Sequence, residues 1–315
     1  MSKLVKLSIV AAAALLACGS AQAAGANRVW VSGHGTDQTG CGAPTAPCRS
    51  LQYAHDNIGA GGEIDILDPA GYGAVSITKA ISIVNDGVGT AGVQAASGSA
   101  VTINAGPTDS VYLRGLNIDG VRQQGLNGIL FQGGGALTIV DCVARHFENA
   151  GIALAPASGS MRIGIANTIA SDNHTAGVVL SPSSGTVGLV LDHVTTGNDN
   201  TGIAVSAQEG TLLNVTLWYV VASNDGTGVQ ATSSVAPVYL NIDNSVMNDN
   251  VGDGLNFDHS IIVSLSRSAL DENGNHGVSN AASDGGIFKS TGDNRILDNN
   301  MADINGPGPS LEALH

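Results

Sequence analysis

The sequence predicts an all-β fold, a single-stranded right-handed parallel β-helix of about ten coils with a short N-terminal capping helix. Seven glycines, each followed by an aliphatic residue, recur at intervals of 23 to 26 residues: Gly128, Gly151, Gly177, Gly202, Gly228, Gly254 and Gly277. Between them, short apolar alternations are separated by Gly, Asn, Asp and Ser, a pattern typical of strands joined by turns. One repeat accommodates three short strands and three turns, so the chain is expected to stack coil upon coil.

The composition disfavours the other solenoid architectures. Glycine makes up 43 of the 315 residues, and Asn and Asp recur in every repeat, where the interior of a helix would lose stability. Leucine-rich repeats have a similar length, but their L-x-x-L-x-L pattern does not fit this sequence. The calcium-binding nonapeptide G-G-x-G-x-D is also missing from the sequence.

Residues 1–23 are predicted to be a signal peptide. Lys3 and Lys6 form a basic start, an apolar segment follows, and Ala21-Gln22-Ala23 is a small-residue cleavage signal. The apolar segment is too short to span a bilayer stably, so we expect no transmembrane segment in the mature chain. The protein is therefore expected to be secreted or periplasmic. The alternative is a lipoprotein anchored at Cys18, because residues 15–18 resemble a bacterial lipoprotein box.

The remaining chain is expected to form three parts. Residues 24–68 form an N-terminal cap region with a strand near residues 28–32 and a short amphipathic helix that starts after Ser50 and ends near Gly59. This helix would cover the open end of the coil, since terminal repeats need a cap. Residues 69–305 form the parallel β-helix. Residues 306–315 form a C-terminal tail that begins with a Gly-Pro-Gly-Pro stop.

The cysteines fit an exported protein. Cys41 and Cys48 flank a short Pro-containing segment, which predicts a local disulfide. The alternative, one half of a C-x₆-C metal site, finds no His or Cys pair to complete it. Cys142 is left over and is interpreted as a buried structural thiol, because free cysteine behaves as a small hydrophobic residue.

The charge of the chain limits its partners. The formal net charge is −14, and it becomes −16 when the two lysines of the signal peptide are removed. Such a protein should repel nucleic acid and anionic membranes. It should also repel polyuronates unless a divalent cation bridges the two. We therefore expect no nucleic-acid partner.

Polar residues near the repeated glycines form two sets of columns. Asparagine stands four residues before the last five glycines, and these side chains are expected to form a hydrogen-bonded ladder in a turn: Asn173, Asn198, Asn224, Asn250 and Asn273. Beside them, the catalytic candidates are Glu148, Asp172, His174 and Asp199. The substrate-binding candidates are Arg122, Arg145, His146 and Asp225.

These candidates are expected to share one edge, because neighbouring coils lie about 4.8 Å apart. Carboxylates on adjacent coils would then have about the spacing that glycoside hydrolysis needs. The competing interpretation is an ordinary solvated turn, since the turns of any β-helix must be polar. Asp199 and Asp225 also offer oxygen ligands for calcium, although no calcium-binding loop motif is present. No metal ligand or cofactor is assigned.

Several segments resemble bacterial right-handed β-helix proteins of the pectin-lyase-like superfamily. The segments are residues 47–54 (PCRSLQYA), 62–67 (GEIDIL) and 71–73 (GYG), together with the N-x-x-x-G-[IV] repeats. The similarity covers about residues 28–300, nearly the whole mature chain. It implies a fold and not an activity, because the superfamily includes polysaccharide lyases, glycoside hydrolases and epimerases beside members of unknown role.

Comparison with the enzyme motifs of that superfamily disfavours a known reaction. The N-T-D and D-D motifs of the polygalacturonase-like hydrolases are missing, and residues 275–277 (NHG) only approximate their G-H-G. The epimerase-like D-P-H-D is poorly matched by residues 257–260, and no set of calcium-binding acids is recognisable. Trp218 and Tyr219 are interpreted as filling an irregular coil rather than as a platform for stacking sugars.

The sequence is compatible with two classes of function. The first is an exported protein that binds or processes extracellular or cell-envelope polysaccharide. The second is a non-catalytic structural or adhesive protein of the surface or matrix, in which the rigid rod is itself the function.

The export signal yields the first prediction. Mass spectrometry of the secreted protein should find Ala24 as its first residue, because cleavage is expected after Ala23. A lipidated Cys18 at the N-terminus would contradict this and would make the protein membrane-anchored.

Overall fold

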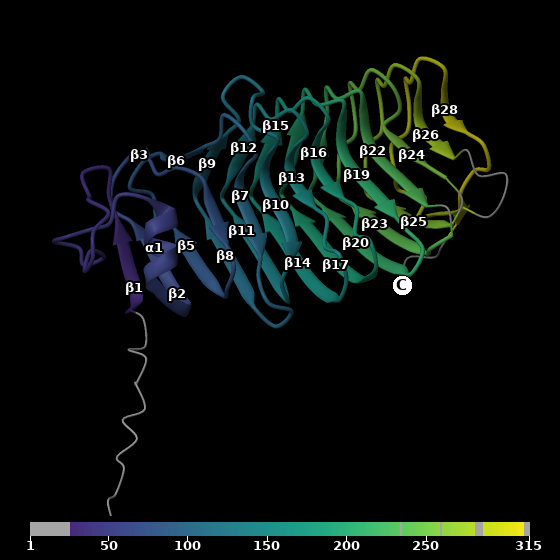
Figure 1. Ribbon diagram of the computed structural model, residues 1–315. Coiled ribbons are helices and arrows are strands. Elements are labelled where there is room, and N and C mark those ends of the chain that lie inside the picture. Colours follow the sequence, from purple (N-terminus) through teal and green to yellow (C-terminus); the bar gives the residue numbers. More distant parts are fainter. Residues whose placement is uncertain (1–25, 234, 259, 281–285, 312–315) are drawn as a thin grey trace, which may run out of the picture.

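The computed structural model describes residues 26–233, 235–258, 260–280 and 286–311. It is nearly all β, with 53% strand and 3% helix, and it forms a parallel β-solenoid of about nine turns (Figure 1). The β-helix predicted from the glycine repeat is therefore confirmed. The predicted signal peptide lies outside the described residues. Within the described ranges, no helix is long and apolar enough to cross a membrane.

Three parallel sheets form the walls of the coil, and from residue 58 to residue 233 each turn visits them in the same order. In the later described turns the second sheet continues only as isolated bridges at Val246, Ala269 and Arg295. Within the described ranges, the first sheet contains β1 (Ala26–Val31), β2 (Ile58–Ile66), β5 (Ile81–Val84), β8 (Ser110–Arg114), β11 (Ala136–Val140), β14 (Ser160–Ala166), β17 (Gly185–Asp192), β20 (Thr211–Trp218), β23 (Val238–Asp243), β25 (Ile261–Ser266), β27 (Ile287–Ser290) and β29 (Ser310–Leu311). The second contains β3 (Ala70–Gly71), β6 (Ala91–Gln94), β9 (Leu116–Asp119), β12 (Val143–Arg145), β15 (Ile169–Ser171), β18 (Thr195–Gly197) and β21 (Val221–Ala222). The third contains β4 (Val75–Ile77), β7 (Ser99–Asn104), β10 (Asn127–Gly133), β13 (Ala150–Leu154), β16 (Ala176–Leu180), β19 (Thr201–Ala207), β22 (Thr227–Ser233), β24 (Leu255–Phe257), β26 (His276–Asn280) and β28 (Ala302–Asn305).

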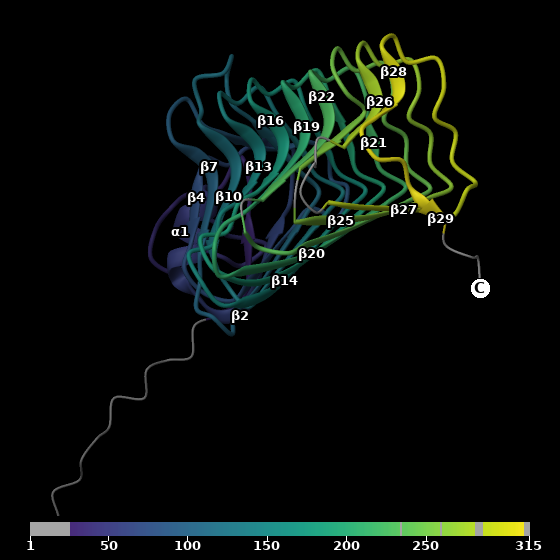
Figure 2. The same cartoon turned by 90° about the vertical axis from the view of Figure 1, so that its right-hand side faces the viewer.

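The strands pair in register, so that like residues stack from coil to coil. Ile203 pairs with Val178 on one side and with Val229 on the other, and all three side chains are buried. Along most strands of the first sheet, buried residues alternate with residues that face outward, as β20 shows from Thr211 to Trp218. In the third sheet, by contrast, β13 is buried along its whole length. Figure 2 shows the first and third sheets facing one another across this interior. Stacked aliphatic side chains fill the interior, which explains how a chain with 3% aromatic residues builds a core.

Helix α1 (Leu51–Asn57) covers the N-terminal end of the third sheet. Its N-cap is Ser50, whose side chain accepts a hydrogen bond from the backbone N–H of Tyr53, as the sequence predicts. Gln52 and His55 on the helix accept hydrogen bonds from the backbone of Ser76 and Thr78, at 2.7 and 3.2 Å. The helix therefore satisfies donors on the free edge of β4, which would otherwise be open to pairing with another chain.

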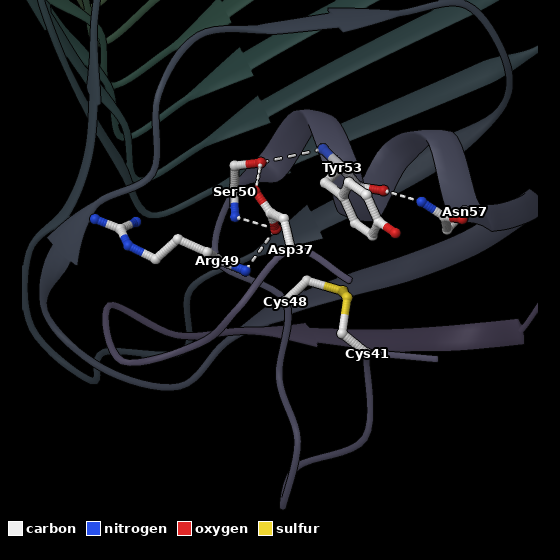
Figure 3. Close-up of a disulfide and its surroundings, with 7 residues drawn as sticks. All are labelled: Asp37, Cys41, Cys48, Arg49, Ser50, Tyr53 and Asn57. Atoms are coloured by element: carbon white, nitrogen blue, oxygen red, sulfur yellow. Dashed lines mark hydrogen bonds between the residues drawn. A yellow bond between two sulfur atoms is a disulfide. The ribbon is translucent and has the colours of Figure 1, made fainter. Parts of the chain in front are cut away.

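The loop before α1 is closed by the disulfide predicted for Cys41 and Cys48, whose Cα atoms are 5.0 Å apart (Figure 3). The carboxylate of Asp37 accepts hydrogen bonds from the backbone N–H groups of Arg49 and Ser50 and from the Ser50 hydroxyl. These contacts fix the loop to the start of the helix. The remaining cysteine, Cys142, is free and buried, and burial raises the pKa of its thiol to about 11.

A ladder of buried polar side chains runs through the corner between the second and third sheets. In each coil a side-chain Oδ1 accepts a hydrogen bond from the backbone N–H of the ladder residue one coil earlier, at 2.7 to 3.2 Å. The side chains that accept these bonds are Asn173, Asp199, Asp225, Asn250, Asn273 and Asn299. The ladder asparagines also donate through Nδ2 to backbone carbonyls, so that side-chain hydrogen bonds link the successive coils at this corner.

The prediction that Asn198 and Asn224 belong to this ladder is wrong. Both adopt the left-handed conformation with a φ of 60°, and their side chains are exposed. Each stands one residue before the ladder position, because in these two coils that position is three residues before the glycine instead of four. Asp199 and Asp225 occupy the ladder instead.

The two aspartates bring carboxyl groups into a dry interior. Asp199 is 5% exposed and its Oδ2 has no hydrogen-bond partner, whereas Asp225 is fully buried and its Oδ2 accepts a hydrogen bond from the Thr196 hydroxyl. Burial raises the pKa of Asp199 to about 8, with a contribution from the charge of Asp225. Burial likewise raises the pKa of Asp225 to about 6. A protonated carboxyl group has both a hydrogen-bond donor and an acceptor, as the side-chain amide of asparagine does. The protonated aspartates therefore resemble the asparagines of the neighbouring coils in their hydrogen bonding.

The buried face yields a second prediction. The Ile203→Asp variant should lose several kcal/mol of unfolding free energy, because it places an unpaired charge in the core. The matched Ala204→Asp variant, on the outward side of the same strand, should lose about 1 kcal/mol or less. Urea unfolding measures both changes. Equal losses would contradict the assignment of inward and outward faces.

The ladder yields a third prediction. Because the folded-state pKa values of Asp199 and Asp225 lie above their ordinary value of 3.8, the folded protein binds more protons than the unfolded chain between about pH 4 and about pH 8. Stability should therefore fall as the pH rises through this window. The Asp199→Asn variant should be more stable than the wild type at pH 8 by about 2 kcal/mol or more.

Urea unfolding at about pH 5 and about pH 8 tests this prediction. The control is Asn173→Asp, which adds a third carboxyl group to the ladder and should steepen the loss of stability with pH. Identical pH dependence in the wild type and both variants would show that these carboxyl groups do not set it.

Candidate functional site

The sequence-predicted candidates lie at the corner between the second and third sheets, where the structure divides them into a buried and an exposed group. Asp199, a catalytic candidate, and Asp225, a substrate-binding candidate, belong to the internal ladder. Oδ1 of each accepts a backbone N–H of the preceding coil, and both residues are buried. The expectation that they contact substrate, or offer calcium an exposed site, is therefore corrected by their burial.

The exposed group forms stacked turns on successive coils. The backbone N–H of Gln123 donates to the carbonyl of His146, and the N–H of His146 donates to the carbonyl of Asp172. The structure thus brings together the turns that carry Arg122, Arg145, His146 and Asp172. Glu148 and His174 lie just beyond the ladder in the same corner, and their side chains are exposed.

Asp119, which was not among the candidates, organises part of this edge. Its Oδ2 lies 3.1 Å from Nδ1 of His146 and 3.4 Å from Nε of Arg145. Partial burial acts to raise the pKa of Asp119, but hydrogen bonds from the Val121 N–H and from His146 hold it below the usual value. Asp119 stands nine residues before the repeated glycine Gly128. The candidate residues were chosen at other distances from the glycines, so Asp119 was not among them.

The remaining contacts of this edge are local. The carboxylate of Asp172 accepts hydrogen bonds from the side chains of Asn198 and Ser171, both at 3.1 Å. In the part of the chain that the structure describes, no group of three or more His, Cys, Asp or Glu side chains is placed to hold a metal ion. The edge therefore consists of short ion pairs and turn hydrogen bonds over several coils.

A groove lies at a different corner, between the third and first sheets. It consists of two adjoining hollows of about 310 and about 300 Å³ that share Pro107 and Ser160. The loops that join β7 to β8, β10 to β11 and β13 to β14 form its walls. Its polar side chains come from Asn104, Thr108, Ser110, Gln132, Ser158, Ser160 and Arg162.

The groove differs in charge from the rest of the protein. Arg162 is the only lining residue with an ionisable side chain, and no carboxylate lines either hollow. Arg162 is exposed, and no ion pair joins it to an acidic residue within the described ranges. The lining side chains therefore carry a single positive charge, in a chain of net charge −14. The nearby Asp109 carboxylate, in the loop from β7 to β8, accepts a hydrogen bond from the backbone N–H of Gly106.

Sequence reasoning missed this groove because its loops lie outside the repeated columns. The glycine repeat marks the entry to the third sheet, whereas the groove forms after that sheet ends. The only signal there is a run of small and polar residues, such as residues 155–160 (APASGS), which any surface loop can have.

The interpretation of Trp218 and Tyr219 is also corrected. They do not fill a coil, because the alternation of β20 places Leu217 inside and Trp218 outside. Tyr219 follows in the left-handed conformation, with a φ of 52°. The two rings are 43% and 44% exposed, and the ring of His193 stacks on Tyr219 with centroids 4.8 Å apart. An aromatic platform therefore lies at the corner between the first and second sheets.

Comparisons with known proteins bear on the fold. No protein-family model matches the sequence, and no curated protein matches it. Among solved structures, the chain is similar to a crystal structure of pectate lyase Pel9A, with a TM-score of 0.61 and 14% identity over 89% of this chain and 82% of that one. It is also similar to the A-module of the Azotobacter vinelandii mannuronan C-5 epimerase AlgE6, with a TM-score of 0.49 and 13% identity over 81% of this chain and 87% of that one.

At 14% identity, the likeness to the pectate lyase structure concerns the fold alone. It agrees with a coil built of parallel sheets. The chain therefore has a parallel β-helix fold that is similar to that of pectate lyase Pel9A.

Proposed function

We propose that the protein binds an extracellular polysaccharide in the groove between the third and first sheets. The observation that carries the proposal is the pair of adjoining hollows, because each has the volume of a small-molecule site and residues from three successive coils line them. A groove that extends over several coils suits a linear polymer. The similarity of the fold to a structure named as a pectate lyase supports carbohydrate as the ligand class.

The lining of the groove suits hydroxyl-rich ligands. The amides of Asn104 and Gln132 and the hydroxyls of Ser158 and Ser160 can each donate and accept hydrogen bonds. Backbone groups of the glycine-rich turns add further partners without blocking access. Arg162 supplies a planar guanidinium that can hold a sugar hydroxyl or an occasional carboxylate.

The same lining favours binding over turnover. Glycoside hydrolysis by the common mechanisms uses two carboxyl groups on either side of the scissile bond, and the groove has none. The exposed candidates Glu148 and His174 and the half-buried Asp172 lie at another corner of the coil. Catalysis there, with Arg122, Arg145 and His146 holding the substrate, is a rival proposal that the following experiment separates from binding in the groove.

A panel of neutral and uronate oligosaccharides tests the proposal. The Ser160→Trp variant places a large side chain where the two hollows meet, and it should weaken binding of the glycan that the wild type selects by about tenfold or more. Its melting temperature should hardly change, because Ser160 is exposed. Binding is measured by titration calorimetry.

The control is the double variant Arg145→Ala and His174→Ala, which removes side chains at the rival corner. It should bind the selected glycan as tightly as the wild type. If this control loses binding while Ser160→Trp keeps it, the site is the polar edge and not the groove. If the wild type binds no glycan, the structural or adhesive role of the rod is favoured instead.

A further inference from the structure

The aromatic platform is separate from the groove and from the polar edge. Trp218, Tyr219 and His193 gather their rings at one surface, although aromatic residues make up 3% of the sequence. The rings of Trp218 and Tyr219 are 5.2 Å apart at an angle of 43°, and the ring of His193 stacks on that of Tyr219. Stacked rings on adjacent coils form a rigid apolar surface that is open to solvent.

Acidic side chains flank this platform on both sides. Trp218 in β20 pairs with Asp192 in β17 and with Asp243 in β23, so both carboxylates lie one strand away on the same outer face. Asp243 is engaged by Ser266 and Arg267. Asp192 has its Oδ1 2.5 Å from Nδ1 of His193, and within the described residues no contact engages its Oδ2.

We propose that this platform binds a sugar residue that carries a free, protonated amino group. The ring of such a sugar can stack on Trp218, while its ammonium group contacts the aromatic face and the free oxygen of Asp192. A cation is attracted to the face of an aromatic ring, and tryptophan gives the strongest attraction. The net charge of −14 adds a long-range attraction for a polymer of amino sugars.

The arrangement along the coil fits a polymer. Arg162 of the groove lies in β14 and Trp218 lies in β20, with β17 between them, so the two sites are about 10 Å apart along the axis. Between them, Gly164 and Gly188 leave open space on the outer face, where an added Cβ would meet no atom within 4 Å. The amino-sugar inference rests on the proposed function only in taking the ligand to be a carbohydrate. The residues of the platform are different from those that line the groove.

The experiment compares two oligosaccharides of equal length, one of glucosamine and one of N-acetylglucosamine, at mildly acidic pH and low salt. The wild type should prefer the glucosamine oligomer, and added salt should weaken that preference. Trp218→Ala should lower the affinity for it about two- to fivefold, whereas Trp218→Tyr should retain most of the affinity. Asp192→Asn should reduce the preference for the free amine without reducing affinity for the acetylated oligomer.

The matched control is Tyr239→Ala. Tyr239 is an exposed aromatic residue on the same sheet, but its strand neighbours are the uncharged Asn214 and Ile262. This variant should leave both affinities unchanged. Equal affinity for the two oligomers, or an Asp192→Asn variant with an unchanged preference, would overturn the amino-sugar inference. A third outcome is that the protein binds another glycan but no glucosamine oligomer, and that Ser160→Trp abolishes this binding. That outcome would overturn the amino-sugar inference and leave the proposed function standing.

Discussion

Parallel backbone pairing between successive coils is the interaction on which the rest of this structure depends. Each strand lies in register with the strand one coil earlier and one coil later, so a side chain at a given position meets its counterpart from the next repeat. Aliphatic residues can then stack into a core that needs few aromatic side chains. The two ends of the coil are the places where this pairing stops, and at the N-terminal end the side chains of α1 satisfy donors on the edge of β4.

The same stacking makes the ladder sensitive to single substitutions. An asparagine offers an acceptor to the neighbouring coil and a donor to a carbonyl, as Asn250 does with Asp225 and Ala222. An aspartate in that place keeps the acceptor but has a donor only when protonated. Asp199 and Asp225 stand on adjacent coils, and each raises the cost of ionising the other. The sequence therefore contains a local conflict with the fold in the middle of an otherwise consistent ladder.

The fold could be predicted from the sequence because its main constraint is periodic. Seven glycines gave the coil length, and Ser50 marked the start of the capping helix. The ladder was misassigned in two coils because a turn can shorten by one residue without any change of composition. Asn198 and Asp199 are both good turn residues, and only the backbone decides which of them points inward. The groove could not be predicted, because it depends on how three loops of different sequence lie together.

Charge is distributed unevenly over this acidic coil, and the three corners differ in the charged side chains that they carry. The groove between the third and first sheets has no carboxylate among its lining side chains, so a bound anionic polymer would meet no negative charge at direct contact there. The corner between the first and second sheets places carboxylates beside aromatic rings, where cations are favoured. At the corner between the second and third sheets, Arg145 and His146 pair with Asp119. Because the coil is rigid, these environments stay at fixed separations along its axis. A polymer that carries both kinds of substituent would therefore contact the groove and the aromatic platform at once. The charge that it carries at each of these two sites would set its direction along the coil.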